Sequence, residues 1–132
     1  MRTRVLALTA ALALVLAACS GGPDDVADTP DTPDETAADG AVTFVGNESI
    51  QWEQDSKTAT LVDGSLDVTI ECVGAVPHNV NLEGVDDDAV IAECDGDDTG
   101  TGTVEMEPGT YEFYCSIPGH REAGMVGEIA VS

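Results

Sequence analysis

Apolar and polar residues alternate along several short segments in the second half of the chain. The clearest alternation covers residues 66–72 and ends at Cys72. A period of two residues is typical of a strand that turns one face toward a core, so Cys72 is expected to point inward. The same pattern predicts strands at 111–115 and 125–131, which flank one short loop.

Further short segments have strand character. They are residues 42–45, 58–62, 79–82, 89–92 and 102–106. Turn residues separate them, as at Pro108–Gly109–Thr110, and no segment repeats its apolar residues at a helical period. These features predict an all-β domain, and seven or eight strands without helices between them favour a β-sandwich.

The N-terminus has the organisation of an export signal. A short basic head is followed by an apolar run, Val5 to Ala18, and then by Cys19. Residues 1–18 are therefore predicted to be a signal peptide. The sequence Leu-Ala-Ala-Cys at 16–19 resembles the lipobox of bacterial lipoproteins, which implies lipidation of Cys19. An ordinary signal cut near Ala18 and an uncleaved anchor are the alternatives, although the run is shorter than the roughly 20 residues that span a membrane.

Residues 19–40 have the composition of a tether. They are rich in Gly, Pro, Asp, Thr and Ala and contain no aromatic residue. Such a segment cannot bury enough apolar surface to order itself, and its repeated aspartates repel one another. We expect an acidic, disordered tether at 19–40 and one folded domain at 41–132.

The chain is strongly acidic, with 26 acidic and four basic residues. Arg2 and Arg4 would leave with the signal, so that only Lys57 and Arg121 remain. This balance excludes a nucleic-acid-binding surface. An acidic surface steers cationic partners, but it also serves solubility or a high-salt habitat, and the sequence leaves these alternatives open.

One loop carries three potential metal ligands at even intervals. Four residues separate Cys115 from His120, and four separate His120 from Met125. The chain has two histidines, and the other is His78. Two imidazoles and a thiolate with a weak axial thioether are the ligands of a mononuclear blue copper site. The sequence thus predicts one copper ion held by His78, Cys115, His120 and Met125.

Other metal sites fit these residues less well. Zinc binds Cys and His tetrahedrally, but methionine is a poor zinc ligand. A binuclear copper centre needs a second cysteine in the loop, and residues 116–121 contain none. Multicopper oxidases and nitrite reductases need more histidines than the two in this chain.

The cysteine count indicates one disulfide. Of the four cysteines, Cys19 is assigned to lipid and Cys115 to copper, which leaves Cys72 and Cys94. Disulfides persist in exported proteins, so these two are expected to pair. Two buried free thiols are the alternative.

The residues around the predicted ligands resemble those of the cupredoxins, the type 1 blue copper family that includes plastocyanin, azurin, auracyanin, halocyanin and rusticyanin. The specific part is Pro77–His78–Asn79 together with residues 111–126, and the loop spacing is similar to that of rusticyanin. The resemblance covers 41–132 and implies a Greek-key β-sandwich. It also implies that Asn79 hydrogen-bonds across the site and braces the Cys115 loop, and that the His120 edge reaches the surface as an electron port.

Four protein ligands leave no open position for a substrate, so we expect an electron carrier rather than an enzyme. The predicted partners are membrane-bound or extracytoplasmic redox proteins, such as a cytochrome, an oxidase or a reductase. The protein is expected to be monomeric and lipid-anchored at the extracytoplasmic face of the cell membrane, in the periplasm or at the cell surface. A module for copper storage, delivery or sensing is the alternative function.

Overall fold

The computed structural model describes residues 38–132. The predicted signal peptide at 1–18, the lipidation site Cys19 and residues 19–37 of the predicted tether lie outside the described residues. Residues 38–40 form a turn into the first strand, and the Gly40 amide donates to the Thr60 carbonyl at 2.8 Å. Hydrogen-bonded structure therefore begins slightly before residue 41.

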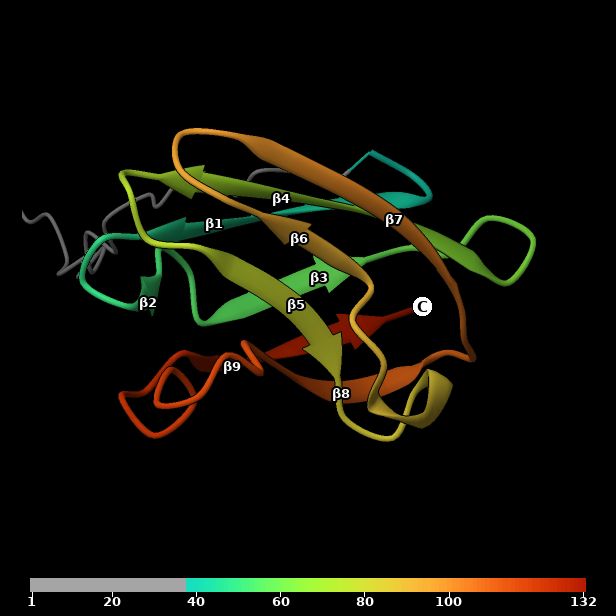
Figure 1. Ribbon diagram of the computed structural model, residues 1–132. Coiled ribbons are helices and arrows are strands. Elements are labelled where there is room, and N and C mark those ends of the chain that lie inside the picture. Colours follow the sequence, from blue (N-terminus) through green and yellow to red (C-terminus); the bar gives the residue numbers. More distant parts are fainter. Residues whose placement is uncertain (1–37) are drawn as a thin grey trace, which may run out of the picture. The chain divides into compact units, whose positions relative to one another are not determined.

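Between residues 38 and 132, nine strands form two facing sheets, which confirms the all-β prediction (Figure 1). The first sheet has the order β2 (Gln51–Trp52), β1 (Ala41–Asn47), β4 (Ser65–Val73) and β7 (Thr99–Glu105). The second has the order β3 (Ser56–Ala59), β9 (Val126–Val131), β8 (Gly109–Tyr114), β5 (His78–Leu82) and β6 (Ala92–Cys94). A short 3-10 turn, η1 (Asp86–Asp88), follows β5. Within residues 38–132, no helix has both the length and the apolar character needed to cross a membrane.

Both sheets are mixed. β1 runs parallel to β4 and β3 runs parallel to β9, whereas the other pairs are antiparallel. In the β1–β4 pair, Gly46 lies opposite Cys72. In the β5–β6 pair, His78 lies opposite Cys94. These two registers bring residues that are distant in the sequence to the same end of the sandwich.

The core lies between the sheets and follows the predicted alternation. Along β4, the side chains at 66, 68, 70 and 72 are buried and those between them are more exposed. An aromatic cluster fills the interior, in which the Phe113 ring lies 4.8 Å from Phe44 and 5.6 Å from Trp52 between centroids. Tilted aromatic pairs of this kind add to the free energy gained by burying their surface.

Three strand predictions need correction. β2 has only two residues, too few to show a periodic pattern, so the count is nine rather than seven or eight. The strand predicted at 58–62 lies at Ser56–Ala59, because Val62 bonds with Ser65 in a turn. The strand predicted at 89–92 lies at Ala92–Cys94, since the chain before it forms the η1 turn with left-handed backbone at 86–88.

A disulfide joins the two sheets. Cys72 on β4 and Cys94 on β6 are bonded, with Cα atoms 5.8 Å apart. The bond closes a loop over a sequence separation of 22 residues. A crosslink over such a loop typically stabilises a domain by about 2–4 kcal/mol. Near it, β6 approaches β7 so closely that a Cβ on Gly100 would lie 1.8 Å from the Glu93 carbonyl oxygen.

Candidate metal centre

His78 begins β5 and is almost completely buried. Its Nε2 atom lies 3.1 Å from the backbone carbonyl oxygen of Asn47, at the end of β1. A carbonyl oxygen only accepts, so Nε2 carries the proton and donates this bond. Nδ1 then holds a free electron pair, and it is buried without a hydrogen-bond partner. A fixed tautomer with an unpartnered nitrogen is the state of a histidine prepared for a metal.

The other three candidate ligands lie in or beside the loop that joins β8 to β9. Cys115 directly follows β8, and Met125 directly precedes β9. The Cys115 amide donates to the Met125 carbonyl at 3.2 Å, and the Met125 amide donates to the His120 carbonyl at 3.0 Å. Gly119 and Gly124 have φ angles of 89° and 102°, which favour glycine. The loop therefore folds back on itself and gathers the three side chains.

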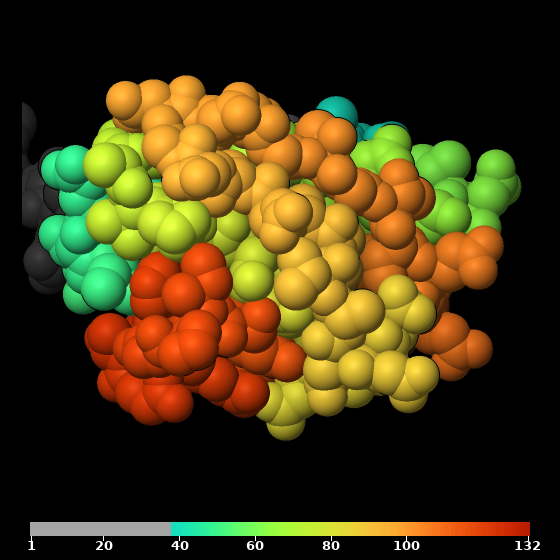
Figure 2. Space-filling view, in the orientation of Figure 1, coloured from blue at the N-terminus to red at the C-terminus, as the bar shows by residue number. Residues whose placement is uncertain are grey.

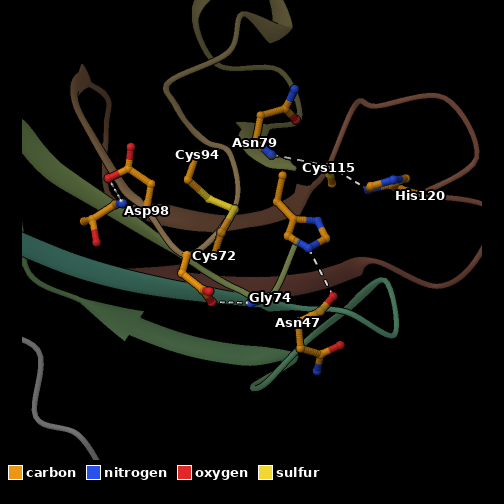
Figure 3. Close-up of a disulfide and its surroundings, with 11 residues drawn as sticks. Asn47, Cys72, Gly74, Asn79, Cys94, Asp98, Cys115 and His120 are labelled. Atoms are coloured by element: carbon orange, nitrogen blue, oxygen red, sulfur yellow. Dashed lines mark hydrogen bonds between the residues drawn. A yellow bond between two sulfur atoms is a disulfide. The ribbon is translucent and has the colours of Figure 1, made fainter. Parts of the chain in front are cut away.

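The structure brings the imidazole and thiol donors together. The candidate ligand atoms of His78, Cys115 and His120 all lie within 4.8 Å of one another. Cys115 Sγ is 3.4 Å from Nδ1 of His120, and Figure 3 shows this contact. Met125 is fully buried, and both its methyl group and the His78 ring lie against Gly46. A pocket with these donors and little water access suits a soft metal ion such as copper.

Asn79 connects the two halves of the site. Its backbone amide points to Cys115 Sγ at 3.5 Å (Figure 3). Its side-chain oxygen accepts a hydrogen bond from the Ser116 amide at 2.8 Å and lies 3.2 Å from the Ser116 hydroxyl. The strand that supplies His78 is thus bonded both to the Cys115 side chain and to the next residue, Ser116.

The environment favours a neutral His78. Burial is the largest cause that lowers the pKa of His78 below its usual value of 6.5. The hydrogen bond to Asn47 raises this pKa in part, and the nearby His120 lowers it again. Since only the neutral ring binds a metal, the depressed pKa keeps protons from competing for the site near neutral pH.

Sequence reasoning missed two residues that contact this site. Gly46 lies so close to it that a Cβ there would be 2.6 Å from His78 Cδ2 and 2.9 Å from Met125 Cε. The neighbouring Asn47 contributes its backbone carbonyl. Neither residue belongs to a motif, and both contact His78 from the facing sheet. A glycine within an alternating strand is the one signal that could have indicated a close approach.

Arg121 lies at the surface directly after His120. Its guanidinium group lies over the ring of Tyr114 and forms ion pairs with Glu83 and Glu112. The pKa of Arg121 is raised, first by its hydrogen bond to Glu83. The residue after His120 is thereby attached to β8 and to the segment after β5.

Comparison with known proteins identifies the family. A model of the copper binding proteins of the plastocyanin/azurin family matches residues 36–132. The chain belongs to this family. Its cofactor is copper, and His78, Cys115, His120 and Met125 have the arrangement of a type 1 copper site.

Three solved structures of auracyanins are similar in fold to this chain. Reduced auracyanin from Roseiflexus castenholzii is 21% identical with a TM-score of 0.57, and the match covers 73% of this chain and 99% of that one. Auracyanin A, a blue copper protein from Chloroflexus aurantiacus, is 19% identical with a TM-score of 0.55, covering 70% and 98%. Auracyanin B is 24% identical with a TM-score of 0.52, covering 74% and 91%. The comparison with curated proteins gave no match.

Proposed function

We propose that this cupredoxin carries single electrons between redox proteins at the extracytoplasmic face of a membrane. His78, Cys115, His120 and Met125 would hold one copper ion, which supplies a one-electron couple between Cu(II) and Cu(I). The observation that carries the proposal is the convergence of three buried donor atoms within 4.8 Å, one of them a histidine nitrogen without any other partner.

The protein contributes rigidity. Hydrogen bonds within the loop and from Asn79 fix the thiol and the His120 ring, and the Asn47 carbonyl fixes the His78 ring. Ligands held in this way cannot rearrange freely when the charge of a bound ion changes. Such a site favours electron transfer over reactions that need an open ligand position.

His120 is the most exposed of the four proposed ligands. It is 7% exposed, whereas His78 is 1% and Cys115 and Met125 are 0% exposed. The loop surface around His120 includes the exposed residues Pro118 and Ala123. In Figure 2 this loop, in red-orange, lies against the yellow-green part of the chain where β4 leads into β5. We therefore place the route for electrons at the His120 edge.

The membrane location rests on the sequence. The lipobox-like residues at 16–19 support an anchor at Cys19, and the acidic segment up to residue 40 has the length and composition of a tether. Metabolic labelling with a fatty acid tests this part: the parent chain should incorporate label and Cys19→Ala should not. Label in the variant would contradict the anchor at Cys19.

Absorption spectroscopy of the copper-loaded protein tests the site. The purified chain with Cu(II) should show an intense blue band, because the Cys115 thiolate transfers charge to the ion. Cys115→Ser should be colourless, while Ser116→Ala should remain blue as the matched control. A parent protein that is colourless, or that binds only Cu(I), would instead support copper storage, delivery or sensing.

A further inference from the structure

The disulfide lies beside His78, although neither cysteine is near it in the sequence. In the β5–β6 pair, Cys94 is directly opposite His78. Residues directly opposite each other in antiparallel strands have Cα atoms about 4.5–5.5 Å apart. The backbone that carries His78 is therefore adjacent to one end of the disulfide.

The other end of the disulfide lies beside the residues that hold the His78 ring. Cys72 is opposite Gly46 in the parallel β1–β4 pair. Gly46 contacts the His78 ring, and the next residue, Asn47, accepts the hydrogen bond from Nε2 at 3.1 Å. The sulfur bridge thus connects β6, which pairs with the strand that carries His78, to β4, which pairs with the strand that contacts the His78 ring.

Two hydrogen bonds strengthen the same connection. The Cys72 amide donates to the Asp98 carbonyl at 2.9 Å, and the Gly74 amide donates to an Asp97 side-chain oxygen at 2.7 Å. Figure 3 shows the disulfide together with Gly74, Asn47 and Cys115. The segment after β6 therefore holds the end of β4 and the start of the connection that leads to His78.

We propose that the Cys72–Cys94 disulfide is a positioning element for His78. It fixes the separation of the two sheets where β5 supplies the His78 backbone and β1 supplies the acceptor for its ring. Without this bond, β6 and β4 can move apart, and the Nε2–H···O bond to Asn47 lengthens. The inference rests on the proposed function, in which His78 binds copper.

The test compares Cys72→Ala/Cys94→Ala with the parent in the full chain. Loss of groups that orient a metal-binding histidine typically costs about 10- to 100-fold in metal affinity, and we expect this loss of Cu(II) affinity in a chelator competition. In the metal-free protein, NMR should show faster exchange of the His78 Nε2 proton in the double variant.

Leu66→Ala is the matched control for a general loss of stability. Leu66 is fully buried on β4, roughly 20 Å along the strand from Cys72 at about 3.3 Å per residue. This variant should keep the parent's copper affinity and His78 proton exchange. An equal change in Leu66→Ala would overturn the proposal, because the effect would then follow stability rather than position.

Two other results would also overturn it. One is a double variant with the parent's copper affinity and proton exchange. The other is a double variant that fails to fold even when refolded with copper, which stabilises the native state, since the disulfide would then act on the whole fold. A parent protein without a blue band would contradict the copper function, while the NMR comparison would still test the positioning of His78.

Discussion

The guanidinium carbon of Arg121 lies 4.2 Å from the centroid of the Tyr114 ring. This contact joins the residue after His120 to the residue before Cys115. Arg121 also pairs with Glu112 on β8 and with Glu83, which directly follows β5. The contact between Arg121 and Tyr114 therefore joins the two ends of the segment that carries Cys115 and His120.

Replacement of Arg121 should loosen this loop. Arg121→Ala removes both the contact with Tyr114 and the ion pairs, so copper should dissociate faster and the melting temperature should fall modestly. Arg121→Lys keeps the charge but not the planar stacking group, and we expect an intermediate effect. Stopped-flow transfer of copper to a chelator measures the rate. Parent-like rates in Arg121→Ala would show that the contact does not restrain the loop.

Gly46→Ala should disturb the site from β1. The added Cβ would lie 2.6 Å from His78 Cδ2 and 2.9 Å from Met125 Cε, so both side chains must shift. Overpacking typically costs about 1–3 kcal/mol, and here it should also change the blue band and the reduction potential. Ala59→Val overpacks the end of β3, where Ala59 pairs with Val131. This control should lose stability without a spectral change, and equal spectra for Gly46→Ala and the parent would contradict the assigned contact.

The pKa of His78 predicts how acid affects the metal-free protein. It is lowered, mainly by burial, so the unfolded chain takes up a proton near pH 6.5 while native His78 stays neutral. Stability should therefore fall as the pH decreases from about 6.5 toward the native pKa, by at most about 1.4 kcal/mol per pH unit from this group. Denaturant unfolding from pH 7 to pH 5 measures this decrease in the free energy of unfolding. His78→Gln should remove the part of the decrease that His78 contributes. An NMR titration that places the His78 pKa at or above 6.5 would contradict the prediction.

Met125→Leu should keep the blue colour and raise the reduction potential. The substitution nearly conserves volume in a fully buried position, so the cost in stability should stay below about 1.5 kcal/mol. The axial ligand tunes the potential, and loss of the thioether destabilises Cu(II) more than Cu(I). Met106→Leu is the control, because Met106 packs against the core after β7. Equal potentials for Met125→Leu and the parent would exclude Met125 as the axial ligand.

Much of the fold followed from local patterns. The alternation at 66–72 predicted the buried face of β4, and the alternation at 111–115 and 125–131 predicted the last two strands and the loop between them. Both signals arise from residues close together in the sequence. β2 was missed and β6 was predicted three residues too early, because pairing with β1 and β5 defines these strands rather than a pattern of their own.

The surroundings of His78 could not be predicted in the same way. Gly46 and Asn47 lie on β1 in one sheet and contact His78 on β5 in the facing sheet, a contact between distant segments that no local period encodes. The position of Cys94 opposite His78 depends likewise on the register of β5 with β6. The sequence thus indicated which donors exist, while the strand registers determine what holds them.

Voltammetry of the copper-loaded full chain tests the central claim most directly. We predict a reversible one-electron wave that accompanies loss and recovery of the blue band, and Cys115→Ser should lack this wave. An irreversible response, or release of copper on reduction, would contradict an electron carrier with a closed site formed by His78, Cys115, His120 and Met125.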